Sequence, residues 1–107
     1  MDRVLNEAIG IFDEVVEIRR DIHRHPEQGN QEFRTSSLVK EKLVEFGVDE
    51  LLTPTETGVV GVIKGRKGAG KVIGLRCDMD ALPVTEATGL PFASEVEGVM
   101  HACGHDM

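Results

Sequence analysis

Four side chains that can bind a metal or carry a proton fall within six residues: His101, Cys103, His105 and Asp106. Cysteine and histidine suit zinc and chemically similar ions, and aspartate adds a harder oxygen ligand. Gly104 lets the backbone bend so that Cys103 and His105 converge on one centre. Ligands this close in sequence rarely complete a four-ligand site, so the cluster is typical of half a metal site. The alternative is a surface loop with an inert cysteine, because H-x-C-x-H is no standard zinc-finger spacing.

A pair of carboxylates, Asp78 and Asp80, forms a second candidate for chemistry. The pair follows a segment with the composition of a buried strand. Because ligands of α/β sheets bind beyond the carboxyl ends of strands, these carboxylates are placed to hold a metal or to orient a histidine ligand. The alternative is ordinary turn chemistry, since aspartate is favoured where a strand ends.

Other motifs favour structural explanations. His23 and His25 lie on different faces of a helix end, where the helix dipole favours partly positive imidazoles. Residues 65–71 match the start of a phosphate-binding P-loop, but Val72 replaces the required serine or threonine and no helix follows. A nucleophilic role for Cys103 ranks below metal binding, because neither neighbouring histidine can easily align with its thiolate.

Two helices and a β-hairpin are expected to position these residues. Apolar residues recur at three- and four-residue steps over residues 3–24, which predicts a helix that ends before a proline. A second helix is expected to begin between residues 32 and 35 and to end at Phe46. The β-branched segments 59–64 and 71–77 predict two strands joined by a glycine-rich turn. The order predicts an α/β fold with a mixed sheet covered by helices.

The fold is expected to be incomplete within these 107 residues. Only two clear strands are predicted, and the last 30 residues hold the reactive side chains but little regular structure. The sequence therefore predicts part of a larger domain.

Composition excludes several classes of function. The chain carries 12 Lys+Arg and 19 Asp+Glu, a net charge of −7, which argues against nucleic acid and against a polybasic membrane anchor. The longest apolar run, Val59–Ile63, is far short of the roughly 20 residues that span a bilayer. The first residues do not resemble a signal peptide, and two cysteines make no disulfide framework. A reducing, cytoplasmic location is expected.

Three segments together resemble one enzyme family: Ile18–Glu27, Gly74–Pro83 and Met100–Asp106. They are similar to the N-terminal part of metal-dependent amidohydrolases that cleave N-acyl amino acids. That family includes bacterial aminoacylase-type enzymes, hippurate hydrolase and plant hydrolases of auxin–amino acid conjugates.

The resemblance implies roles for three residues. It implies that Cys103 and His105 bind metal, the thiolate being able to bridge two ions, and that Asp80 orients a ligand. Related metallopeptidases have a histidine ligand where this chain has Asp78, so that ligand role is not transferred. The family more often has alanine at Cys77. Two divalent ions are implied, with zinc, manganese, cobalt and nickel all compatible with the donors.

The resemblance also implies an architecture and a reaction. Residues 1–107 would be the N-terminal part of an α/β/α catalytic domain, without the lid or dimerisation domain. The glutamate that acts as general base and the remaining ligands would lie beyond residue 107. The full-length parent would hydrolyse the amide of a small-molecule N-acyl amino acid and would have no nucleic-acid or membrane partner. Its oligomeric state is open, and a homo-oligomer is one possibility.

The isolated chain is expected to be inactive, because it holds neither the general base nor a full ligand set. Two alternatives to an enzyme remain open. One is a non-catalytic metal-binding or interaction module that uses Cys103, His105 and a partner chain. The other is an inactive remnant of a broken gene.

Overall fold

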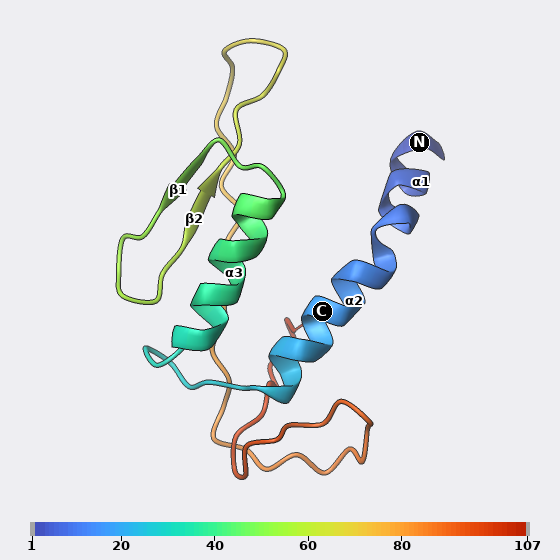
Figure 1. Cartoon of the computed structure of the whole chain (residues 1–107), viewed down its shortest axis with the longest axis vertical. Coiled ribbons are helices and arrows are strands. Elements are labelled where there is room, and N and C mark those ends of the chain that lie inside the picture. Colours follow the sequence, from blue (N-terminus) through green and yellow to red (C-terminus); the bar gives the residue numbers. More distant parts are fainter. Residues whose placement is uncertain (1, 107) are drawn as a thin grey trace. The chain divides into compact units, whose positions relative to one another are not determined.

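Three helices precede a two-stranded antiparallel sheet in the computed structural model, which describes residues 2–106 (Figure 1). The elements are α1 (Asp2–Gly10), α2 (Phe12–Arg24), α3 (Phe33–Glu45), β1 (Glu50–Leu52) and β2 (Val60–Val62). The chain divides into two compact units, one made of residues 1–26 and 81–107 and the other of residues 27–80. The predicted α/β class is confirmed, in the form of a partial domain.

The helix expected over residues 3–24 is divided into α1 and α2 at Ile11. The Ile11 amide donates to the carbonyl of Ala8, three residues back, and Ile11 has φ −105° and ψ 0°. Gly10 precedes this break, and glycine is a poor helix former. The expected end is confirmed, because α2 stops at Arg24 and His25 leaves the helix before Pro26. None of the helices in residues 2–106 is long and apolar enough to cross a membrane.

Helix α3 begins within the expected limits and ends at Glu45, one residue before the expected Phe46. It starts at Phe33, where the Glu27 carboxylate accepts hydrogen bonds from the amides of Arg34 and Thr35. Glu27 therefore satisfies donors that the first turn of a helix leaves without partners. At the other end, Gly47 has φ 79° and donates its amide to the carbonyl of Val44. A left-handed glycine is the usual exit from a helix, as the sequence predicts.

The hairpin is built from a different pair of strands than expected. Strand β2 lies inside the predicted strand 59–64, but its partner is β1, with Leu51 opposite Gly61. The strand expected over residues 71–77 is wrong, because these residues form no strand in the described chain. The glycine-rich segment 65–70 therefore joins no hairpin. The composition of residues 71–77 is that of a buried strand, but Val72 is 97% exposed. A strand also needs a hydrogen-bonded neighbouring strand, and these residues have none in the described chain.

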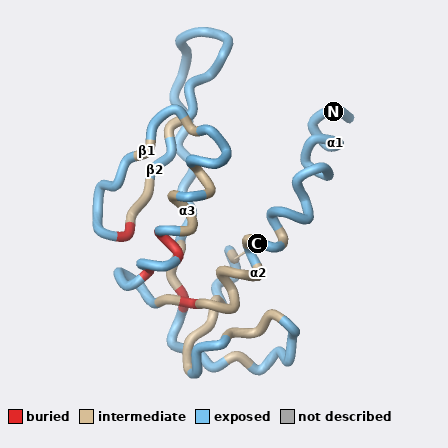
Figure 2. Tube along the Cα trace, viewed as in Figure 1, coloured by how far each residue is buried: buried red, intermediate tan, exposed pale blue. Residues whose placement is uncertain are grey.

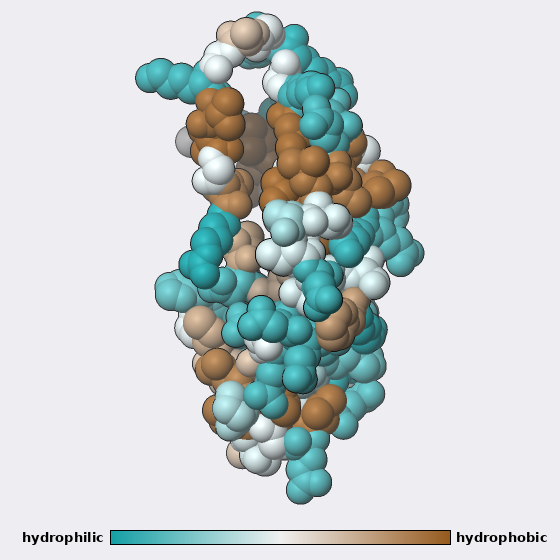
Figure 3. Space-filling view, turned by 90° about the vertical axis from the view of Figure 1, so that its left-hand side faces the viewer, coloured by the Kyte–Doolittle hydropathy of each residue, from teal (hydrophilic) through white to brown (hydrophobic). Residues whose placement is uncertain are grey.

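The described residues bury little apolar surface (Figure 2). Ala81 is the one buried hydrophobic residue among residues 2–106, whereas Thr35 and Ser36 at the start of α3 are almost fully buried. Large hydrophobic side chains are exposed on α1, on both strands and in residues 71–77, and brown hydrophobic atoms lie open on the face shown in Figure 3. This agrees with a partial domain, because burial of such side chains is the main stabilising term in folding.

Gly61 allows β2 to lie close to the residues around the end of α3. A Cβ atom on Gly61 would lie 3.3 Å from both methyl carbons of Leu43 and 3.4 Å from a methyl of Val48. We expect Gly61→Ala to lower the free energy of unfolding by about 1 kcal/mol, because these side chains must shift. Denaturant unfolding measures this, with Gly65→Ala as control, since no atom lies within 4 Å of a Cβ at Gly65. Equal unfolding midpoints for the two variants would contradict the close approach.

Candidate metal centre

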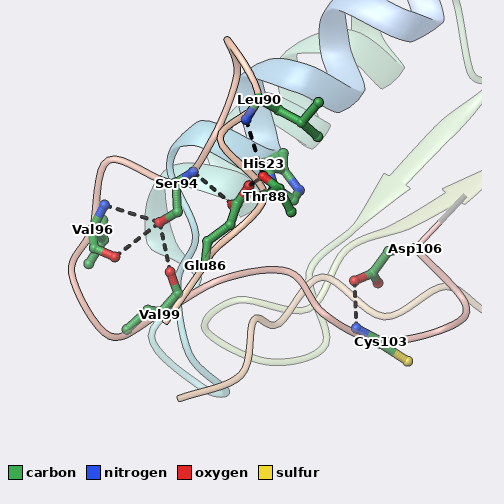
Figure 4. A network of polar contacts seen from close by, with 9 residues as sticks. All are labelled: His23, Glu86, Thr88, Leu90, Ser94, Val96, Val99, Cys103 and Asp106. Atoms are coloured by element: carbon green, nitrogen blue, oxygen red, sulfur yellow. Dashed lines mark hydrogen bonds and ion pairs between the residues drawn. The ribbon is translucent and has the colours of Figure 1, made fainter. Parts of the chain in front are cut away.

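A tight turn carries the two predicted metal ligands. The backbone amide of Cys103 donates to the Asp106 carboxylate at 3.0 Å (Figure 4), and the amide of Asp106 donates to the carbonyl of Cys103 at 3.1 Å. These two bonds close the turn from both ends. Inside it, Cys103 Sγ lies 3.6 Å from His105 Nδ1, and both side chains are exposed. The structure thus brings together the two residues that the sequence singled out.

The separation of these two donors fits a shared metal ion. Tetrahedral zinc with Zn–S near 2.3 Å and Zn–N near 2.0–2.1 Å holds its sulfur and nitrogen about 3.6 Å apart. Cys103 Sγ and His105 Nδ1 stand at that distance, which a weak sulfur–nitrogen hydrogen bond also allows. Residues 2–106 contain no group of three or more His, Cys, Asp or Glu side chains that could hold a metal. The turn therefore offers two donors of a larger set, and their role as ligands stays a prediction.

The two aspartates lie in the other unit, residues 27–80. Asp78 is exposed and pairs with Arg76, two residues away, at 2.7 Å, so its contact is local. Asp80 is half-buried, and a Cβ placed on Gly29 would lie 3.8 Å from its Oδ2. Nothing in this geometry tests the orienting role implied for Asp80, which stays a prediction.

A buried polar pair, His23 and Glu86, was missed by the sequence analysis. His23 Nε2 lies 2.8 Å from Glu86 Oε1, and their side chains are only 11% and 4% exposed. Glu86 also accepts hydrogen bonds from the Ser94 amide at 2.9 Å and from the Thr88 hydroxyl (Figure 4). Burial raises the pKa of Glu86, but the bonds from Thr88, Ser94 and His23 outweigh it and hold that pKa below its usual value. Glu86 is therefore ionised at neutral pH, and His23 is the donor in the pair.

The two histidines at the end of α2 have different surroundings. The ring of His23 also meets Phe92 edge-on, with centroids 5.8 Å apart, and lies tilted to His101 at 6.2 Å. His25 donates to the Asp21 carbonyl and lies 3.4 Å from the exposed Glu95 carboxylate. The helix dipole explains neither the burial of His23 nor its partner. No spacing rule could have found Glu86, since it is 63 residues away in sequence.

Comparisons with known proteins place the chain in a family context. Residues 74–107 match the model of "Peptidase family M20/M25/M40". The chain is 50% identical over 107 residues to thermostable carboxypeptidase 1 of Saccharolobus solfataricus, which covers 99% of this chain and 27% of that protein. It is 48% identical over 103 residues to hippurate hydrolase of Campylobacter jejuni, covering 96% of this chain and 27% of that protein.

A solved structure gives the same answer for the fold. The YXEP protein of Bacillus subtilis, described as a dinuclear metal-binding peptidase from the M20 family, superimposes with a TM-score of 0.83 at 46% sequence identity. The match covers 91% of this chain and 27% of that one. The chain thus spans about a quarter of the length of the relatives it matches. On these matches, the chain corresponds to the N-terminal part of members of peptidase family M20/M25/M40.

Proposed function

We propose that the full-length protein containing this chain is a metal-dependent amidohydrolase that cleaves the amide between an acyl group and an amino acid. In this proposal, residues 1–107 contribute the N-terminal part of its catalytic domain, and Cys103 and His105 are two of its metal ligands. The observation that carries the proposal is the 3.6 Å separation of Cys103 Sγ and His105 Nδ1 in a turn closed by two hydrogen bonds. The names of the relatives support it, because hippurate is itself an N-acyl amino acid.

A pair of divalent ions, when bound, would polarise the amide carbonyl and make a water molecule more acidic. Zinc, manganese, cobalt and nickel all suit the mixed donors, and two ions are proposed because the YXEP protein is described as dinuclear. Cys103 would bind as a thiolate, so metal uptake releases a proton and the affinity for metal rises with pH. Asp80 is proposed to orient one of the metal ligands.

The test is hydrolysis by the full-length protein. After treatment with a chelator, release of the amino acid from hippurate and from N-acetyl amino acids is expected to cease. It is expected to return when zinc, manganese, cobalt or nickel is added back. The 107-residue chain alone is expected to release nothing under the same conditions, because two donors do not hold a metal pair. Unchanged hydrolysis without metal, or none with any metal, would refute the proposal.

A carboxypeptidase activity is the second candidate, and it is favoured by the name of the Saccharolobus solfataricus relative. It differs in substrate and not in the bond cleaved, since both reactions hydrolyse an amide next to an amino acid with a free carboxylate. Peptides that are blocked at the N-terminus distinguish the two. Faster release of the C-terminal residue from these peptides than from N-acetyl amino acids would favour the carboxypeptidase.

A further inference from the structure

The end of α2 and the segment that leads into the Cys103 turn are joined by buried polar contacts. The imidazole of His23 and the carboxylate of Glu86 form the centre of this contact, at 2.8 Å. The Arg24 carbonyl adds a second link, because it accepts a hydrogen bond from the Glu95 amide at 2.9 Å. The guanidinium of Arg20 also stands over the Phe92 ring, 4.7 Å from its centroid. Helix α2 is thereby connected to residues 86–95 at several points within one unit.

From Glu86 the contacts continue along the chain toward the turn. Glu86 Oε1 accepts the amide of Ser94, and Ser94 Oγ lies 2.7 Å from the carbonyl of Val99 (Figure 4). The next residue, Met100, exchanges two backbone hydrogen bonds with Leu82, at 2.9 and 3.0 Å. These bonds fix the backbone up to residue 100, three residues before Cys103.

His101 completes the path to the metal ligands. Its ring lies beside that of His23, with centroids 6.2 Å apart, and it precedes Cys103 by two residues. His23 therefore contacts the segment at two places, through Glu86 near its start and through His101 near its end. Loss of the bond to Glu86 would remove the first of these contacts and leave the ring of His101 as the second, so α2 would hold the segment before the turn less firmly.

We propose that His23 and Glu86 are positioning residues that hold residues 94–101 so that Cys103 and His105 present their donor atoms to one metal ion. This inference rests on the proposed function, since it assumes that the turn binds metal. Neither residue is a ligand in this proposal, because His23 Nε2 and both Glu86 oxygens are engaged in the contacts described above.

The chemistry of the pair favours a positioning role over a purely stabilising one. A buried ionised carboxylate loses hydration, so a pair such as His23 and Glu86 is weak evidence for a gain in stability. Its hydrogen bonds are directional, however, and they fix where each bonded segment lies. Outer-shell groups that hydrogen-bond to a metal ligand change metal affinity by about 10–100-fold when they are removed, and a pair that acts through the backbone is expected at the lower end of that range. The expected effect is therefore larger on metal affinity than on unfolding.

The experiment compares two substitutions of His23 in the full-length protein. His23→Gln places an amide nitrogen near the position of Nε2, where it can still donate to Glu86. His23→Asn carries the same amide on a shorter side chain that does not reach. His25→Asn is the matched control, because His25 lies on the same helix end and pairs with the exposed Glu95. Each metal-free protein is titrated with Co²⁺ at one pH, and the thiolate-to-cobalt absorption reports the Cys103 bond. Thermal unfolding is measured for every variant.

The proposal expects His23→Asn to weaken Co²⁺ binding about tenfold or more. His23→Gln and His25→Asn are expected to stay within about threefold of the parent, and all four proteins are expected to unfold within a few degrees of one another. Equal affinities for the His23→Asn variant and the parent would overturn the positioning role. The role is also overturned if His23→Gln binds Co²⁺ as weakly as His23→Asn, because the bond to Glu86 would then not explain the loss of affinity. It is overturned as well if His23→Asn does not fold, because the pair would then serve folding alone. A parent protein that shows no thiolate-to-cobalt band refutes the proposed function itself.

Discussion

Replacing Cys103 by alanine in the full-length protein is expected to abolish bound metal and hydrolytic activity together. The thiolate is the strongest donor in the turn, and its removal leaves the imidazole of His105 as the one predicted ligand there. The number of metal ions per protein is measured by elemental analysis after dialysis, and activity is measured by release of the amino acid from hippurate. We expect less than a tenth of the metal content of the parent and no measurable turnover.

Cys77→Ala is the matched control for this experiment. Cys77 is also a free, exposed cysteine, but it lies in the unit formed by residues 27–80, outside the Cys103 turn. The control variant is expected to keep both metal and activity. If Cys103→Ala retained the metal and the turnover of the parent, the assignment of Cys103 as a ligand would be wrong. If Cys77→Ala lost them to the same extent, the effect would not be specific to the turn.

The parts of the fold that the sequence predicted are those decided by local signals. Pro26 disfavours helical dihedrals at the residue before it, and α2 ends there. Gly47 adopts the positive φ that a helix exit needs, and α3 ends two residues earlier. Strand pairing is not local, and residues 71–77 show the consequence. Their β-branched composition indicated a strand, but no strand within residues 2–106 pairs with them.

In the candidate site, too, the features set by neighbouring residues could be predicted and the long-range contacts could not. Cys103 and His105 are separated by a single glycine, so the sequence alone was enough to expect that they converge. His23 lies 63 residues from Glu86. Only the folded chain brings that pair together, and a histidine at a helix end has the simpler explanation of the dipole. The approach of two donors that are close in sequence could therefore be predicted from the sequence, whereas the contact between His23 and Glu86 could not.

The second large effect is expected at Glu27, whose carboxylate caps helix α3. Oε1 accepts the amide and the hydroxyl of Thr35, both at 2.6 Å, and Oε2 accepts the Arg34 amide at 3.0 Å. The Thr35 side chain is almost fully buried. Glu27→Ala leaves these donors without an acceptor, so we expect a loss of about 2–3 kcal/mol in the free energy of unfolding. Glu27→Gln keeps one oxygen for Thr35 and is expected to lose about 1 kcal/mol.

The pH dependence of the free energy of unfolding distinguishes the contribution of the Glu27 charge from that of its side-chain shape. Partial burial raises the pKa of Glu27, but the hydrogen bonds from Thr35 and Arg34 and the Arg34 charge outweigh it and hold that pKa below its ordinary value of 4.5. A carboxylate whose pKa is lowered by folding stabilises the protein fully above the unfolded-state pKa, and this stabilisation is lost as the pH falls through the folded-state pKa. The difference between the parent and Glu27→Gln is therefore expected to be constant from pH 6 to 7 and to shrink below about 4.5.

Denaturant unfolding of the metal-free full-length protein at a series of pH values measures this difference without a contribution from metal release. Glu45→Gln is the control on the same helix, because Glu45 forms an exposed pair with Lys42 at the opposite end of α3. Exposed pairs contribute little, so this variant is expected to change the free energy of unfolding by no more than about 0.5 kcal/mol. A Glu27→Gln difference that persists unchanged at low pH would show that the amide fails for steric reasons, and that the charge at the start of α3 contributes nothing.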